Sequence, residues 1–400
     1  MSKPVFSFGT SRGGTTFFAR IMSVNPKVKM ASDPFLPLFR AFRTEVMRQS
    51  IDPNFDAAKP LDDYYFSERK IKMMKAIQKS RLTLTFPQAQ LEELQKLLFA
   101  RMSLAAKELA PLVREIQGND FLELFRSGLS VLEKVYEAKD ALWCGSNDNW
   151  VIEFLPILAR DFPEAKFIVV IRDPRAAMAS SMRNREKYPT LVPLMYSFAH
   201  HWRKHAAFTW KLMKNQNLKD RLFIFRYEDL VISPEEKTKE ICGFLKVVFD
   251  PTMLVPDHFR PISGEKWTVY SHYDEVPKNK IYTDSIDIWK KYLDKGTIEF
   301  IEFICDPEMR LFGYEPQEYL EEASSPEIMN FLIEDDKRAQ GWRGDHESWD
   351  KELTHEIFRK QVLKTDENLI TPAMAEQNYL FPEVLQGCRE LELKPGYRHE

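Results

Sequence analysis

The feature that most constrains the fold is a series of five short apolar, β-branched or aromatic runs, each followed by a turn and a helical pattern. The runs are Val5–Phe8, Lys27–Ala31, Ala141–Cys144, Phe167–Ile171 and Leu222–Phe225. The run at 167–171 is apolar throughout, as expected of a parallel strand covered on both faces. Strands that alternate with helices predict an α/β fold with a parallel sheet and right-handed crossovers. Because ligands bind beyond the carboxyl ends of such strands, the residues directly after each run are the functional candidates.

Two regions depart from this alternation. Between about residues 50 and 140 the pattern is helical, for example at Leu91–Leu98 and Leu122–Val135, and predicts a helical insertion. We therefore expect an α/β domain over residues 1–320, followed by an acidic extension over 321–400 that packs on the domain or trails from it. The extension has 18 acidic and 10 basic residues, whereas residues 1–320 carry a net charge of +5, so the total of −3 averages two unlike regions.

Composition and residue spacing argue against nucleic-acid, membrane and metal binding. The near-neutral total gives no support to a nucleic-acid partner. The apolar runs are strand-sized, far below the roughly 20 residues that a membrane helix needs. The four cysteines lie dozens of residues apart, and His201 and His205 have no neighbouring acid that completes a known motif, so we expect no metal site. A cytoplasmic location is expected, and the oligomeric state is left open.

The segment 9–16, Gly-Thr-Ser-Arg-Gly-Gly-Thr-Thr, directly follows the first run and opens a helix. Gly13 and Gly14 allow the backbone to pass close to a ligand, and the N–H groups of a helix start bind anions. Arg12 adds a planar cation, while Thr15 and Thr16 add hydroxyl donors. These residue types predict a phosphate-binding loop, although an ordinary strand-to-helix turn with a Ser or Thr cap is the alternative.

An ATP-binding loop is the nearest competing interpretation, since Gly9 and Gly14 have the G-x-x-x-x-G spacing. Thr15 stands where that loop needs its lysine, and the cation Arg12 comes before the second glycine instead. This displacement argues against ATP hydrolysis.

The loop resembles the 5′-phosphosulfate loop of sulfotransferases, whose pattern is Lys/Arg-Ser-Gly-Thr-Thr and which use 3′-phosphoadenosine 5′-phosphosulfate (PAPS). A second family motif is a strand that ends in Arg and is followed eight residues later by Ser. Arg172 and Ser180 match it in register, and the resemblance implies that they bind the 3′-phosphate of PAPS. Taken alone, the segment 172–175, Arg-Asp-Pro-Arg, could also form a salt bridge at a helix start.

Two later segments extend the resemblance. The segment 226–234 is similar to the family's Tyr-Glu-Asp-Leu stretch, which would place Tyr227 against the adenine, with a core position as the alternative. The segment 289–314 is similar to the closing helices of carbohydrate and tyrosylprotein sulfotransferases. Lys280 lies where relatives place a loop that closes over PAPS, and the alternative is that it is a solvated surface lysine.

The resemblance also assigns roles in catalysis. Arg12 would stabilise charge on the leaving phosphate, and the base in these branches is a Glu shortly after the second strand. Asp33 occupies that position here, as part of an Asp-Pro pair, and a helix N-cap or Asx-turn is its alternative role. Asn147 replaces a lysine that assists transfer in relatives, so either Arg12 suffices or Lys278 or Lys280 contributes.

The sequence thus predicts a PAPS-dependent sulfotransferase that acts on a hydroxyl or an amine of a small-molecule or saccharide acceptor, releases adenosine 3′,5′-bisphosphate and requires no metal. The fold expected for this enzyme is a P-loop-like parallel sheet flanked by helices. Two alternatives stay open. One is a P-loop-type nucleotide kinase, and the other is a degenerate PAPS-binding module, which the Asp33 and Asn147 departures would suit.

Overall fold

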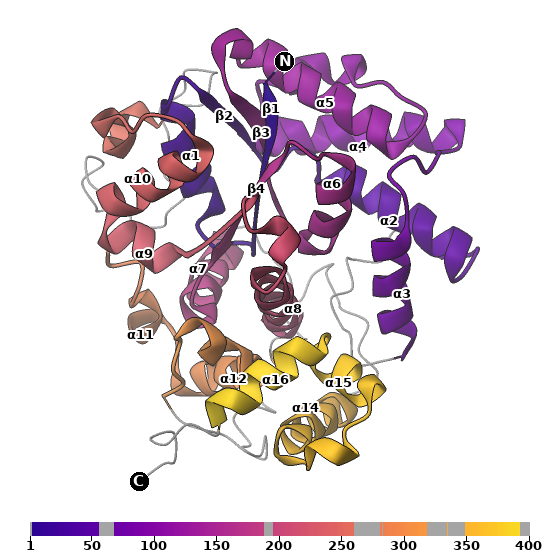
Figure 1. Cartoon of the computed structure of the whole chain (residues 1–400), viewed down its shortest axis with the longest axis vertical. Helices are drawn as coiled ribbons and strands as arrows, with labels where there is room; N and C mark the ends of the chain where they lie inside the picture. Colours follow the sequence, from indigo (N-terminus) through magenta and orange to yellow (C-terminus); the bar gives the residue numbers. More distant parts are fainter. Residues whose placement is uncertain are drawn as a thin grey trace. The chain divides into compact units, whose positions relative to one another are not determined.

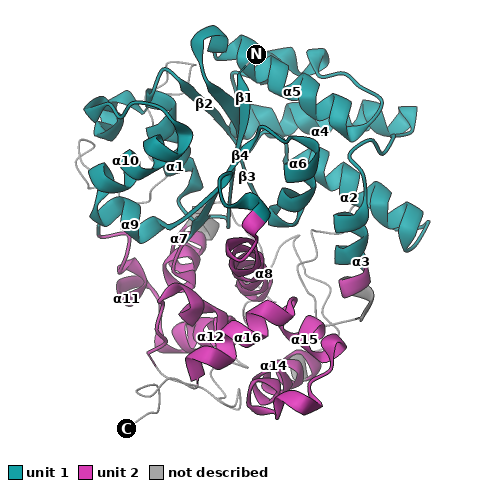
Figure 2. Ribbon diagram, viewed as in Figure 1, with its two compact units in different colours: residues 1–58, 73–171, 217–283 teal, residues 59–72, 172–216, 284–400 magenta. Residues whose placement is uncertain are grey.

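The computed structural model describes residues 2–55, 68–187, 195–259, 281, 283–317, 334 and 349–392 (Figure 1). The chain forms two compact units, each assembled from separate stretches of sequence (Figure 2). Unit 1 comprises Met1–Ala58, Met73–Ile171 and Asn217–Thr283, and unit 2 comprises Lys59–Lys72, Arg172–Gln216 and Asp284–Glu400. The expected domain boundary at residue 320 lies outside the described residues and stays a prediction.

Unit 1 is built on a five-stranded sheet in the order β2-β3-β1-β4-β5. Every neighbouring pair is parallel, which confirms the predicted fold class. The strands are β1 (Lys3–Gly9), β2 (Val28–Ser32), β3 (Trp143–Asn149), β4 (Lys166–Ile171) and β5 (Leu222–Arg226).

Strand β3 begins and ends later than the sequence pattern predicts. Residues 145–149, expected to follow a strand that ends at Cys144, are themselves part of β3 and pair with β1 along its length. Residues 143–147 pair with β2 as well. Flanked by two strands, β3 has its backbone hydrogen bonds satisfied on both sides, so its polar side chains do not prevent strand formation.

Helices cover both faces of this sheet (Figure 1). On one side lie α1 (Thr15–Val24), α9 (Tyr227–Ile232) and α10 (Pro234–Leu245), and on the other α2 (Leu36–Ser50), α5 (Phe121–Val135) and α6 (Leu155–Asp161). Between α2 and β3 the chain also forms α3 (Glu68–Lys79) and α4 (Gln88–Ala105), and α4 packs on α2. Phenylalanines fill the α5 side of the core, where the rings of Phe6 and Phe125 have centroids 5.6 Å apart.

The described residues of unit 2 are helices and their connections. They form α7 (Pro174–Lys187), α8 (Met195–Met213), α11 (Ile288–Tyr292), α12 (Lys295–Cys305), the 3₁₀ helix η7 (Glu308–Phe312), α14 (Trp349–Lys364), α15 (Pro372–Tyr379) and α16 (Pro382–Glu392). Helix α7 packs against α8, α11 and α12, while α16 packs against α8, η7, α14 and α15.

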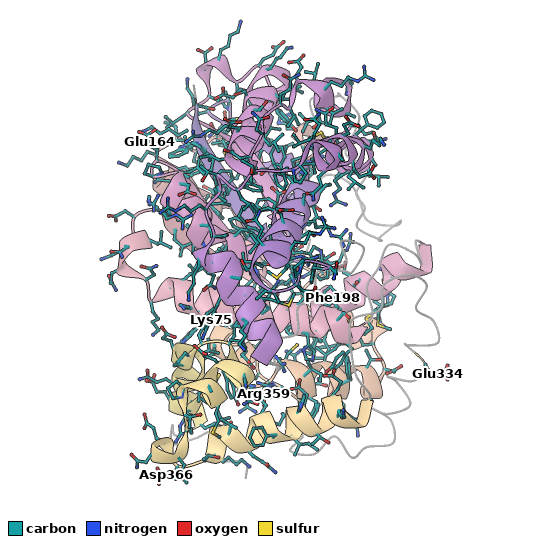
Figure 3. All side chains as sticks on the ribbon, turned by 90° about the vertical axis from the view of Figure 1, so that its right-hand side faces the viewer. Lys75, Glu164, Phe198, Glu334, Arg359 and Asp366 are labelled. Atoms are coloured by element: carbon teal, nitrogen blue, oxygen red, sulfur yellow. The ribbon has the colours of Figure 1, made fainter. Side chains whose placement is uncertain are left out.

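Buried charges join the C-terminal extension to the rest of unit 2. Arg203 on α8 pairs with Glu356 on α14 at 2.7 Å, and Arg359 on α14 (Figure 3) pairs with Glu308 of η7 at 2.8 Å. All four side chains are fully buried. Removing one partner would leave a buried charge uncompensated, at a cost of about 3–5 kcal/mol. Within unit 2, then, the described part of the extension is packed on its neighbours.

The same cluster predicts an acid-sensitive stability. His200 Nε2 lies 3.3 Å from Glu356 Oε1, and desolvation followed by the charge of Arg203 lowers the pKa of His200 to about 3. The unfolded chain, with an ordinary histidine pKa of about 6.5, takes up this proton first, so stability falls as the pH drops below about 6.5. Between pH 7 and pH 5 this site should cost about 2 kcal/mol.

The measurement is urea unfolding of the wild-type chain and of His200→Gln at both pH values. The variant should be less stable at pH 7, yet its stability should depend less on pH. Equal dependence in the two proteins would show that His200 does not titrate in this way.

A second prediction concerns the close approach of β1 and β3. A Cβ atom added at Gly145 would lie 1.8 Å from the Val5 carbonyl oxygen. Gly145→Ala should therefore lower the free energy of unfolding by about 2–3 kcal/mol, as overpacking does. Gly243→Ala is the matched control, because nothing lies within 4 Å of a Cβ there. Chemical denaturation would measure both, and an unchanged midpoint for Gly145→Ala would contradict the prediction.

Candidate functional site

The loop after β1 has a backbone that requires glycine. Gly14 has a left-handed φ of 88°, and a Cβ atom there would lie 2.1 Å from Cδ2 of Tyr227. A Cβ atom at Gly13 would lie 2.9 Å from the Thr10 carbonyl oxygen, which accepts a hydrogen bond from the Gly13 N–H at 3.0 Å. The ten-residue helix α1 then starts at Thr15 without a side-chain cap from the described residues. The loop therefore presents helix-start N–H groups, as an anion site requires.

Arg12 is the cation of this loop. It is half-buried and has a left-handed φ of 62°, a conformation that costs a non-glycine residue about 1 kcal/mol or more. The tight turn between Gly9 and Gly13 holds it there. Such strain is common where a loop is shaped for a ligand.

Hydrogen bonds connect this loop to the ends of β2 and β3. Thr15 Oγ1 donates to Asn149 Oδ1 at 3.0 Å, and Thr16 Oγ1 lies 3.1 Å from Ser32 Oγ. Asn147 Nδ2 in turn donates to Ser32 Oγ at 3.4 Å. Thr15 is buried and uses its hydroxyl within the protein, whereas Thr16 is exposed. The structure thus brings the predicted loop residues and Asn147 together at one edge of the sheet.

Asp33 lies at the same edge, directly after β2. Its backbone has a φ of 55°, and its N–H donates to the Asn147 carbonyl oxygen at 2.6 Å. The residue preceding α2 is Phe35, and no described side chain caps that helix, so Asp33 is not an N-cap. Its carboxylate pairs with Arg101 instead. The sequence gives no sign of this pair, because Arg101 lies 68 residues further along the chain.

Asp148 is a second carboxylate at this edge that the sequence interpretation missed. It is buried on β3 and accepts hydrogen bonds from Ser146 Oγ at 2.5 Å and from the Phe35 N–H at 3.1 Å. Burial raises the pKa of Asp148 to about 6, against the opposing effects of these hydrogen bonds and of the Arg101 charge.

Tyr227 is the first residue of α9 and follows β5 directly. Its ring packs on Gly14 and meets the ring of Phe17 edge-on, with centroids 6.2 Å apart. The side chain is 8% exposed. It is therefore both buried and in contact with the loop, and its predicted contact with adenine stays a prediction.

Arg172 belongs to unit 2 and directly follows β4 in the chain. Its Nη2 donates to the Ser285 carbonyl oxygen at 2.7 Å, and its own carbonyl oxygen accepts from Trp202 Nε1 at 2.8 Å. Ser180 is half-buried on α7. Their predicted role at the 3′-phosphate stays a prediction, while the predicted Lys280, together with Lys278, lies outside the described residues.

The helix-start salt bridge that the sequence allowed does form, with Arg175 as the cation. Arg175 Nη2 lies 2.7 Å from Asp173 Oδ2, and its Nη1 lies 2.6 Å from Glu302 Oε1. The guanidinium also lies 4.2 Å from the centre of the Trp289 ring. The bridge therefore accounts for Arg175 and gives no reason for the arginine at position 172.

In the part of the chain that the structure describes, no helix is long and apolar enough to cross a membrane. Among the same residues, no three His, Cys, Asp or Glu side chains gather as a metal-ion site would require.

Parts of the sequence match known proteins. The model of the sulfotransferase family matches residues 4–251. Carbohydrate sulfotransferase 3 of Tetronarce californica is 26% identical over 41% of this chain and 39% of its own length. A putative protein-tyrosine sulfotransferase of Caenorhabditis briggsae is 23% identical over 48% of this chain and 65% of its own.

Among solved structures, the sulfotransferase domain from the curacin biosynthetic pathway aligns with a TM-score of 0.42 and 16% identity, covering 84% of this chain and 97% of that one. The chain spans between about two fifths and two thirds of the length of the first two relatives named above. Since the family model covers more than half of the sequence, the chain belongs to the sulfotransferase family.

Proposed function

We propose that this protein transfers a sulfuryl group from PAPS to a hydroxyl or an amine of a small-molecule or saccharide acceptor and releases adenosine 3′,5′-bisphosphate. The observation that carries the proposal is the loop from Gly9 to Thr16, whose glycines cannot be replaced without a clash and whose helix start is uncapped by the described residues.

The loop has the two features that the 5′ end of PAPS would need, a helix start and a cation. The backbone N–H groups from Gly14 to Thr16 would donate to the 5′-phosphosulfate, while the Gly13 N–H closes the turn on Thr10, and Arg12 would neutralise charge that develops on the leaving phosphate. Tyr227, which packs on Gly14, would contribute an aromatic face to the adenine. PAPS supplies the sulfuryl group for the reaction. Positioning and charge stabilisation of an in-line displacement supply most of the catalysis in the related phosphoryl transfers.

Asp33 is the proposed general base. It lies at the same edge as the loop, because Ser32 next to it contacts Thr16. As the acceptor oxygen forms its bond to sulfur, Asp33 would take the hydroxyl proton, and the sulfur–oxygen bond to the leaving phosphate would break. The relatives are named for carbohydrate and protein-tyrosine substrates, both of which present hydroxyl groups, and this supports a hydroxyl acceptor.

The nucleotide assignment predicts thermal stabilisation by adenosine 3′,5′-bisphosphate. A ligand at 100 times its Kd adds about 2.7 kcal/mol to the free energy of unfolding, so the Tm should rise clearly. Arg12→Gln should weaken binding by about 10- to 100-fold, the value of a charge-assisted hydrogen bond. Arg114→Gln is the control, because Arg114 is exposed on the 3₁₀ helix Ala110–Glu115.

Adenosine 5′-monophosphate, which lacks the 3′-phosphate, tests the proposed 3′-phosphate site separately from the 5′ site in the same thermal assay. If Arg172 binds the 3′-phosphate, Arg172→Gln should bind the bisphosphate no better than the monophosphate. The absence of any shift with the bisphosphate would contradict the PAPS assignment, and a shift with ATP alone would favour the nucleotide kinase.

The base assignment predicts a loss of turnover without a loss of nucleotide binding. With PAPS and a set of monosaccharides, disaccharides and phenols, acceptor-dependent release of the bisphosphate should fall by about 10²- to 10⁴-fold in Asp33→Asn. Asp140→Asn, which changes an exposed acid, should keep full turnover. Full turnover in Asp33→Asn would rule out this base, and bisphosphate binding with no acceptor-dependent release would favour the degenerate binding module.

A further inference from the structure

The helical region between α2 and β3 contributes a cation to the candidate site. Arg101 lies on α4 and contacts Asp33 through both of that residue's acceptor groups. Its Nε donates to the Asp33 carbonyl oxygen at 2.9 Å, and its Nη2 pairs with the Asp33 carboxylate through Oδ2. One guanidinium therefore fixes the backbone and the side chain of the same residue.

This contact uses only one of the two carboxylate oxygens of Asp33. Oδ1 is buried and accepts no hydrogen bond from any residue that the structure describes, while the side chain as a whole is 13% exposed. A buried carboxylate oxygen without a donor costs free energy, about 1–3 kcal/mol by mutational estimates. A substrate hydroxyl would be a donor of the kind that this oxygen lacks.

The Arg101 guanidinium also interacts electrostatically with a second carboxylate, that of Asp148. The charge of Asp148 raises the pKa of Arg101 against the larger effect of desolvation, and the charge of Arg101 lowers the pKa of Asp148. Asp148 also accepts from the Phe35 N–H, two residues beyond Asp33. The segment that carries Asp33 is thus held by Arg101 at one residue and by Asp148 at another.

The Arg101 guanidinium brings a positive charge to Asp33 that β3, the strand next to it, does not supply at position 147. Asn147 occupies the position where the resemblance expects a lysine, and its side chain donates to Ser32 as a neutral amide. A carboxylate surrounded by neutral groups takes up a proton more readily than one beside a guanidinium. Arg101 places a guanidinium against the Asp33 carboxylate, which the neutral Asn147 amide does not.

We propose that Arg101 is a positioning residue that orients the Asp33 carboxylate and keeps it ionised, with Oδ1 directed to the acceptor hydroxyl. This rests on the proposed function. Pairing with arginine makes a carboxylate a weaker base, but in a loose transition state the nucleophile has formed little of its new bond. The orientation of Asp33 then matters more than its base strength, because geometry sets the probability of reaction.

The first test needs no acceptor. Carbon-13 NMR of aspartate carboxyl groups would follow the titration of Asp33, identified by the signal that is lost in Asp33→Asn. In Arg101→Gln the titration midpoint should move up by about one pH unit or more, and Arg101→Lys should restore most of the shift. Lys96→Gln removes an exposed cation from the same helix and should leave the midpoint unchanged.

The second test separates a catalytic purpose from a purely structural one. In Arg101→Gln, kcat for acceptor-dependent bisphosphate release should fall by about 10- to 100-fold, while the KM for PAPS and the affinity for the bisphosphate change less than twofold. The acidic limb of the kcat profile should move to higher pH, together with the NMR midpoint.

The outcomes distinguish this inference from the proposed function. An unchanged Asp33 midpoint in Arg101→Gln, or an unchanged kcat beside a shifted midpoint, would overturn the positioning role even if the wild-type protein is an active sulfotransferase. A wild-type protein that binds no bisphosphate would instead overturn the proposed function, and the NMR midpoint would still report on the Arg101–Asp33 pair. A fall in kcat with equal loss in Lys96→Gln would also contradict the role, since that variant leaves Asp33 untouched.

Discussion

The candidate site depends on the polar carboxyl end of strand β3, from Ser146 to Asn149. Residues up to Asn147 lie between β1 and β2, and the last two residues of β3 pair with β1. Asn147 and Asp148 are buried, Asn149 is half-buried, and all three bind segments outside the strand. Asn149 accepts from Thr15, Asn147 donates to Ser32, and Asp148 accepts from the Phe35 N–H. Buried polar groups need partners, and here the partners are the loops that follow the adjacent strands. Strand β3 therefore helps to set the positions of both the loop from Gly9 to Thr16 and Asp33.

This dependence explains which parts of the site could be predicted from the sequence. The loop from Gly9 to Thr16 is recognisable because its requirements are local: two glycines, a cation and a helix start stand in one short segment. The five strands were predicted for the same reason, since apolar runs identify them without knowledge of their neighbours. The polar end of β3 lies beyond the run that the sequence predicts, which ends at Cys144, because a strand stabilised by pairing with its neighbours need not show an apolar pattern.

The contact between Asp33 and Arg101, in contrast, could not be predicted from a local sequence pattern. Its partners are 68 residues apart, and neither lies in a motif that points to the other. An aspartate before a proline predicts a cap or a turn, and an arginine on an amphipathic helix predicts a solvated face. Only the packing of α4 against α2 brings the two together. Net charge was equally uninformative about the extension, where Glu356 and Arg359 are fully buried within a region that the sequence describes only as acidic.

The resemblance expects a cation at position 147 of β3, and the proposed base contacts one from α4 instead. A cation at the end of a strand acts through its position, and the same edge of the sheet can be reached from the strand itself or from a helix packed above it. In this chain the strand supplies a neutral amide that hydrogen bonds Ser32, and α4 supplies the guanidinium that pairs with Asp33. The positive charge then lies beside the proposed base rather than on β3, which favours a role in holding that base over direct contact with the transferred group. The helical segment between α2 and β3 thus reaches the proposed base through Arg101, because α4 packs on α2.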